Sequence, residues 1–260
     1  MKRQALLSSM LALCCLIGGT SLVYGQYYGQ ARQSNAGLQA NQQNGPDNVI
    51  FILDASDSMN DRIGGRPKID IAKEVVMSTI RTMPAGVNVG LRVYGHRLGS
   101  NGIGFQGPFG FYNTGGEMCR QTQLLVSPGM NNRAMIASSL LNIQAVGKTP
   151  ITYSLQQSVQ NDFGGLPGKK TIILVSDGRE TCSYNPCDLA LDMVRSGINI
   201  KINTIGFGTR DKVADDQLKC IALSTKGKYF SANTAAELAK SLQDSSQIQT
   251  SVQAKIFTGQ

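Results

Sequence analysis

Apolar and polar positions alternate in blocks along the chain from residue 47 onward. Apolar runs within 48–53 and 171–175, each bounded by polar residues, predict strands that are buried on both faces of a sheet. Apolar residues at helical spacing predict a helix over 69–83. Further strands are expected at 88–94, 123–126, 198–205 and 228–231, and further helices at 132–143, 151–159, 187–194, 215–224 and 234–242.

This alternation of strands and helices predicts an α/β fold with a doubly wound, mostly parallel sheet and helices on both faces. In such folds ligands bind outside the carboxyl ends of the strands, where the strand order reverses. The residues that directly follow each apolar run are therefore the most informative ones for function.

Oxygen-bearing side chains follow the two buried strands. Asp54, Ser56 and Ser58 come directly after the first strand, and Asp177 comes after the later one. Thr149 lies between them in a loop that opens a helix, with proline near the first helical position. Two carboxylates and three hydroxyls, without imidazole or thiolate, indicate a hard cation such as Mg²⁺. Three neutral hydroxyl ligands would leave that ion electron-poor, so it would recruit an acidic group from a partner.

A simpler interpretation of these residues exists. Asp-x-Ser-x-Ser is a short polar turn that occurs often by chance, and Ser and Asp also serve as helix caps. The three segments favour a shared site because each lies at the end of a predicted strand or the start of a predicted helix.

The five residues Asp54, Ser56, Ser58, Thr149 and Asp177 resemble the metal-ion-dependent adhesion site of the von Willebrand factor type A (vWA) domain. The surrounding sequence at 48–54, 93–97 and 177–182 is also similar to that of secreted bacterial members of the family. The resemblance spans about 47–242. It implies a Rossmann-like sheet with one antiparallel edge strand, which fits 123–126. It also implies that the three hydroxyls bind the ion directly, whereas the two carboxylates act mostly through hydrogen bonds and water.

The resemblance implies a protein-binding or adhesion module, not an enzyme, that recognises a partner carboxylate through Mg²⁺, or through Mn²⁺ or Ca²⁺. One alternative is a metal-dependent hydrolase, for which only His96 or Glu180 could serve as the base. The other is a structural scaffold of a cell-envelope complex. Asp57, Arg179 and Glu180 flank the site, where they either tune its charge or are solvated loop residues.

The first 25 residues have the pattern of a secretory signal, with a basic start, an apolar stretch and a small Gly25 at the end. A retained membrane anchor is the alternative, but the stretch contains too many polar residues and glycines to span well. We expect a flexible linker at 26–46, a vWA domain at 47–244 and a tail at 245–260. The mature protein would then be periplasmic or extracellular, without stable membrane insertion.

Four cysteines remain after the leader: Cys119, Cys182, Cys187 and Cys220. An even number in an exported chain favours disulfides over a zinc site. A local bridge between Cys182 and Cys187 would leave Cys119 to pair with Cys220, although cross-pairing is also open.

The remaining signals concern partners. The net charge is +8, but no dense basic run or aromatic RNA-binding motif is present, so no nucleic-acid partner is expected. The dinucleotide-like pattern at 102–107 is rejected because the surrounding glycines and Pro108 forbid the helix that it requires. The glycine-rich stretch 98–118, with its four aromatic residues, either supplies partner specificity or covers the edge strand.

Overall fold

A computed structural model describes residues 45–97, 106–107, 110–111 and 115–246. The expected leader, the linker to residue 44, the end of the tail and most of the glycine-rich stretch lie outside these ranges. The main sheet has six strands in the order β10-β9-β8-β1-β4-β7. Their bounds are β1 (Asn48–Asp54), β4 (Asn88–Tyr94), β7 (Thr122–Gly129), β8 (Lys170–Ser176), β9 (Lys201–Phe207) and β10 (Tyr229–Ala232).

The neighbouring strands of the sheet are parallel except for β7, which pairs antiparallel with β4 at the edge. The predicted fold class and the antiparallel edge strand are therefore confirmed. β1 lies at the centre, and all of its residues are buried. Val49, Phe51 and Leu53 face one core layer while Ile50 and Ile52 face the other, which explains why the sequence shows an unbroken apolar run rather than alternation.

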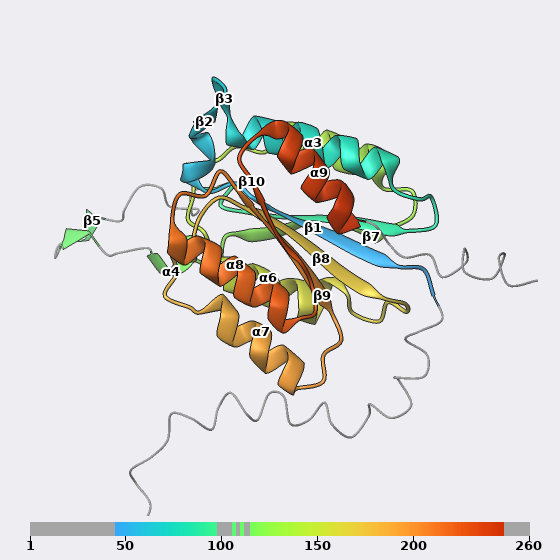
Figure 1. Cartoon of the computed structure of the whole chain (residues 1–260). Helices are drawn as coiled ribbons and strands as arrows, with labels where there is room; N and C mark the ends of the chain where they lie inside the picture. The colour runs from blue at the N-terminus through green and yellow to red at the C-terminus, as the bar shows by residue number, and fades with distance from the viewer. Residues whose placement is uncertain (1–44, 98–105, 108–109, 112–114, 247–260) are drawn as a thin grey trace, which may run out of the picture. The chain divides into compact units, whose positions relative to one another are not determined.

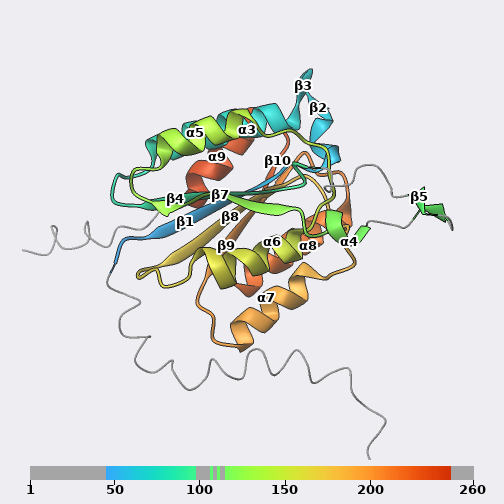
Figure 2. The same cartoon turned by 180° about the vertical axis from the view of Figure 1, so that it is seen from behind.

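Helices cover both faces of the sheet (Figures 1 and 2). One face carries α3 (Lys68–Thr82), α5 (Arg133–Leu141) and α9 (Ala235–Ser246), and the other carries α6 (Ile151–Gln157), α7 (Pro186–Arg195) and α8 (Lys212–Ser224). The smaller elements are η2 (Asp57–Asn60), β2 (Arg62–Ile63), β3 (Arg66–Pro67), β5 (Gln106–Gly107), β6 (Gly110–Phe111), α4 (Gly115–Met118) and η3 (Ser158–Asp162). Across the described ranges, no helix is both long and apolar enough to cross a membrane.

Several sequence-based boundaries differ from the structure by a few residues, and two of the differences have a clear local cause. The strand expected at 198–205 begins only at Lys201, because residues 196–200 form the turn that leaves α7, with Gly197 at φ +75°. The helix expected at 151–159 ends as α6 at Gln157 and continues as the wider π-helical turn η3.

The wider turn η3 carries a buried carboxylate. Asp162 pairs with Arg92 of β4 through two short contacts, from Nε to Oδ2 at 2.6 Å and from Nη2 to Oδ1 at 2.7 Å. The third guanidinium nitrogen, Nη1, donates to Thr122 Oγ1 at 3.0 Å. These contacts tie η3 to the strands β4 and β7.

A buried asparagine fixes the amino end of β1. Asn48 Nδ2 donates to the carbonyl oxygens of Pro46 and Pro167 at 3.0 and 2.6 Å. Its Oδ1 accepts a hydrogen bond from Asn88 Nδ2 at 2.8 Å. The start of the central strand is thus bound to both of its neighbours.

The four cysteines form two disulfides, as predicted; the local Cys182–Cys187 bridge is wrong, and the pairs follow the cross-pairing that the sequence left open. Cys119 pairs with Cys182, and Cys187 pairs with Cys220. α7 begins between the two cysteines of the expected local bridge, and Asn185 caps the helix by accepting the backbone N–H of Cys187 at 3.0 Å. Cys187 therefore lies on a helix that packs against α8, which carries Cys220.

Candidate metal centre

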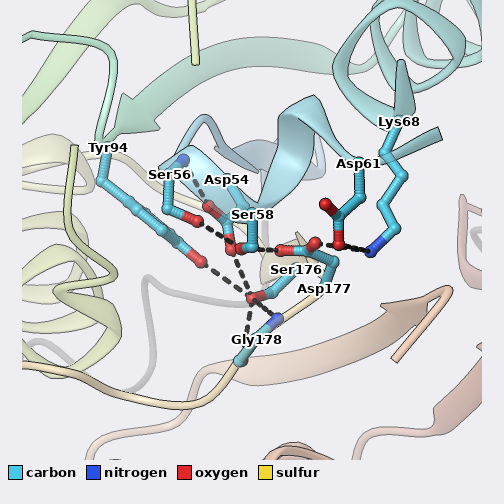
Figure 3. Close-up of polar contacts among 9 residues, drawn as sticks. All are labelled: Asp54, Ser56, Ser58, Asp61, Lys68, Tyr94, Ser176, Asp177 and Gly178. Atoms are coloured by element: carbon cyan, nitrogen blue, oxygen red, sulfur yellow. Dashed lines mark hydrogen bonds and ion pairs between the residues drawn. The ribbon is translucent and has the colours of Figure 1, made fainter. Parts of the chain in front are cut away.

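Asp54 is the last residue of β1, and its carboxylate is fully buried. Oδ1 accepts the backbone N–H of Ser56 at 2.7 Å, and Oδ2 accepts the hydroxyl of Ser176 at 2.6 Å. The phenol of Tyr94, on the adjacent strand β4, donates in turn to Ser176 Oγ at 3.1 Å. This relay of hydrogen bonds fixes the carboxylate at the carboxyl edge of the sheet (Figure 3).

Ser56 and Ser58 follow at the start of η2, and their Oγ atoms lie 3.2 Å apart. Ser58 Oγ donates to Asp177 Oδ1 at 2.7 Å. Asp177 directly follows β8, which is the parallel neighbour of β1. The two halves of the motif therefore meet because adjacent parallel strands end at the same edge (Figure 3).

Gly95 holds the Thr149 loop against the end of β1. Its carbonyl accepts the backbone N–H of Gly147 at 2.8 Å, and the carbonyl of Gly147 accepts the N–H of Asp57 at 2.9 Å. Gly95 has φ +70°, and a methyl group there would lie 2.7 Å from both Lys148 O and Ser56 N. Only glycine permits this close approach of three backbone segments.

Thr149 is buried, and its hydroxyl lies near that of Ser58. A methyl group built on Gly178 would lie 3.6 Å from Ser58 Oγ and 4.0 Å from Thr149 Oγ1. The backbone of Thr149 is held by Thr181, whose Oγ1 accepts its N–H at 2.9 Å and whose N–H donates to its carbonyl at 3.2 Å. All five predicted residues therefore converge, and four of them are buried while Ser58 is exposed.

Glu180 is a positioning residue that the sequence analysis did not identify as one. Its Oε1 accepts the N–H of Cys182 at 2.8 Å, and its Oε2 accepts the N–H of Thr152 in the first turn of α6 at 2.7 Å. Burial raises the pKa of this carboxyl, against the opposing effect of these hydrogen bonds. The side chain is buried, and it joins the Asp177 loop to the helix that follows Thr149.

The other flanking residues have local partners. His96 Nε2 lies 3.2 Å from Gln123 Oε1 on β7, and burial lowers the pKa of the imidazole. Arg179 forms a surface ion pair with Asp211 at 3.5 Å. Asp57 is exposed and accepts a hydrogen bond from Asn60 at 3.3 Å.

The electrostatics of the centre fit a divalent cation. Burial, followed by the negative charge of Asp177, raises the pKa of Asp54 to about 6. A nearby cation would relieve both effects.

Within the described ranges, no cluster of three or more His, Cys, Asp or Glu side chains could hold a metal. An ion here would therefore depend on hydroxyl oxygens, water and an outside ligand, which is a donor set for a hard cation.

The von Willebrand factor type A domain model matches residues 48–245. The chain belongs to the vWA family. It is 31% identical over 192 residues to the Bacillus subtilis (strain 168) protein YwmD, a match that covers 73% of this chain and 80% of YwmD.

Two solved structures with the vWA fold are similar to this chain, each at 18% identity. Proximal thread matrix protein 1 from the mussel byssus, in a structure with a zinc-occupied MIDAS motif, has a TM-score of 0.55. That match covers 78% of this chain and 45% of the mussel protein. The pilus adhesin SpaC from Lactobacillus rhamnosus GG has a TM-score of 0.57, with 79% of this chain and 31% of SpaC covered. These likenesses support the vWA fold.

Proposed function

We propose that this vWA chain is an exported, non-enzymatic binding module that captures an acidic group of a protein partner through a divalent cation. Asp54, Ser56, Ser58, Thr149 and Asp177 would hold the ion. The convergence of these five oxygen-bearing side chains from three separate segments carries the proposal. Bound there, the ion would offer an open coordination position to a partner carboxylate.

Oxygen donors favour Mg²⁺, Mn²⁺ or Ca²⁺. The zinc-occupied MIDAS motif of the mussel protein supports a divalent cation in general, and the pilus adhesin supports an adhesive role. The two disulfides support export, because such bonds persist in oxidising compartments.

The hydrolase alternative is less well supported by the local contacts. A hydrolase would need a base near the ion, and within the described ranges neither candidate base forms a hydrogen bond with the five residues of the cluster. Glu180 accepts two backbone N–H groups, and His96 is bonded to Gln123. We therefore favour binding over catalysis.

Calorimetry on the purified chain tests the proposal. One divalent-cation site is expected in the wild type, and Asp54→Ala should abolish it. Saturating metal should also raise the free energy of unfolding, by about 2.7 kcal/mol at one hundred times the dissociation constant. Asp57→Ala, beside the cluster but exposed, is the matched control and should retain the site. No heat of binding and no change in melting temperature with Mg²⁺, Mn²⁺ or Ca²⁺ would contradict the proposal.

The acidic partner requires a second experiment. Extracellular and cell-surface proteins should be retained by the immobilised chain in Mg²⁺ and released by a chelator. A partner retained equally by the Asp54→Ala variant would not be held through the ion.

A further inference from the structure

A buried ammonium group lies beside the candidate metal centre. Lys68 is the first residue of α3, and its side chain is only 7% exposed. Its Nζ lies 2.8 Å from Asp177 Oδ2 and 3.7 Å from Asp61 Oδ2 (Figure 3). The Asp61 side chain is 70% exposed whereas that of Asp177 is 0% exposed, so Asp177 is the partner that interacts most strongly.

The fold provides a space for this side chain. Gly208 follows β9 with φ +62°, and a methyl group there would lie 3.1 Å from Lys68 Cε and 2.8 Å from Ile63 Cδ1. The amino end of a helix disfavours a cation, because the helix dipole is positive there. A buried lysine at this position therefore needs a nearby carboxylate, and Asp177 supplies it.

The contact with Lys68 occupies one of the two carboxylate oxygens of Asp177. Its Oδ1 accepts the hydroxyl of Ser58, and its Oδ2 accepts the ammonium of Lys68. Both oxygens are thus already used within the protein. With Asp54 and Asp177 ionised, Lys68 and these two buried carboxylates sum to one negative charge, whereas the charge of the exposed Asp61 is screened by solvent. A divalent cation would turn that sum into one positive charge, instead of neutralising the centre.

We propose that Lys68 is a specificity-determining residue whose positive charge weakens metal binding and strengthens capture of an anionic group by the loaded site. The inference rests on the proposed function and deepens it. Without Lys68 the loaded site would be neutral and would hold its metal tightly. With Lys68 the loaded site attracts one more negative charge, which a partner carboxylate can provide.

Three variants separate charge from structure. Lys68→Gln removes the charge but keeps an amide that can donate to Asp177, and Lys68→Met removes both. Lys68→Arg keeps the charge, so its metal affinity should stay closer to that of the wild type than the affinities of the other two variants do. Lys212→Met, which removes an exposed lysine paired with Asp216 on α8, is the control for the change in net charge. Circular dichroism melting in chelator checks that each variant is folded.

Mn²⁺ titration by calorimetry is the first readout. We expect Lys68→Gln and Lys68→Met to bind Mn²⁺ about tenfold more tightly, or more, because repulsion between the ammonium and the ion is lost. Acetate is the carboxylate probe, followed through the water-proton relaxation of the Mn²⁺-loaded protein. Acetate binding should weaken in both variants and return in Lys68→Arg. If Lys68 only stabilised the fold, Lys68→Gln and Lys68→Met would not bind Mn²⁺ more tightly than the wild type.

The outcomes distinguish the two ideas. If the wild type binds no Mn²⁺, the proposed function is wrong and the role of Lys68 is wrong with it. If the wild type binds Mn²⁺ while Lys68→Gln and Lys68→Met bind it equally or more weakly, the role of Lys68 is overturned and the metal centre stands.

Discussion

Arg92 and Asp162 form one buried ion pair and Lys68 and Asp177 form another, but only the second lies at the candidate metal centre. In the first pair a planar guanidinium contacts both oxygens of one carboxylate, and the two side chains are 5% and 2% exposed. In the second pair a single ammonium contacts one oxygen, while the hydroxyl of Ser58 contacts the other.

This difference separates a pair that joins two structural elements from a pair that would also belong to the proposed metal centre. The guanidinium satisfies Asp162 by itself, so that carboxylate is committed to joining η3 to β4. Asp177 is instead divided between a point charge and a hydroxyl that also belongs to the candidate metal cluster. A change in the charge of the cluster will therefore affect Asp177 and leave Asp162 unaffected.

Loss of the Arg92 guanidinium should give the largest effect. Arg92→Met leaves Asp162 buried without its partner, which should cost about 3–5 kcal/mol of unfolding free energy. Urea denaturation in chelator measures the loss, and metal affinity of the folded fraction should be unchanged. A cost below about 1 kcal/mol would mean that Asp162 finds another partner, and the contrast between the two pairs would be wrong.

Asp54→Asn should give the next largest effect, and its sign depends on pH. The pKa of Asp54 is about 6 in the metal-free fold, against an ordinary value of 3.8, so folding favours the protonated form. The preferred protonation of Asp54 in the folded state contributes fully to the free energy of unfolding below pH 3.8. This contribution is lost as the pH rises through 6. The loss should amount to about 2–3 kcal/mol at neutral pH.

The asparagine variant avoids this loss. Its amide can donate to Ser176 Oγ, whose hydroxyl can then donate to the carbonyl of Gly178, already 3.2 Å away. In chelator we expect Asp54→Asn to be at least as stable as the wild type at pH 7 and to bind no metal. Melting curves from pH 4 to 8 test this, and parallel pH profiles for the two proteins would contradict it.

A smaller effect is expected from Glu180→Gln. The amide keeps one acceptor for the two backbone N–H groups of Thr152 and Cys182, so one of them loses its partner. This should cost about 1–3 kcal/mol. Because Thr149 precedes the affected helix, metal affinity should also fall, as calorimetry can show. An unchanged metal affinity would mean that Thr181 alone positions Thr149.

The smallest effect should come from an exposed ion pair. Arg66 and Glu74 contact each other at 2.6 Å, but their side chains are 52% and 63% exposed. Arg66→Met should change the unfolding free energy by less than about 1 kcal/mol. The same denaturation assay checks this result. A larger loss would show that short distance, and not burial, decides the strength of these pairs.

The central strands and the five-residue motif were predictable because each depends on the local amino-acid sequence. An apolar run such as 48–53 fits only a strand buried on both faces, and Asp54 and Asp177 follow such runs directly. Lys68 was not predictable. A lysine at a helix start is normally solvated, and its partner lies 109 residues away. The disulfide pairing failed for a similar reason, since it depends on which helix faces α7.

The position of β1 determines how the domain would transmit a mechanical load. The chain enters β1 at Asn48, and Asp54 lies at the opposite end of the same strand. A partner held at Asp54 and a tether on the chain before residue 45 would pull β1 along its length. The load would pass along the backbone of β1, and the ladders to β4 and β8, which flank it over nearly its whole length, would keep the strand extended. The strand that positions the candidate metal centre would thus also be the main tension-bearing element between partner and tether.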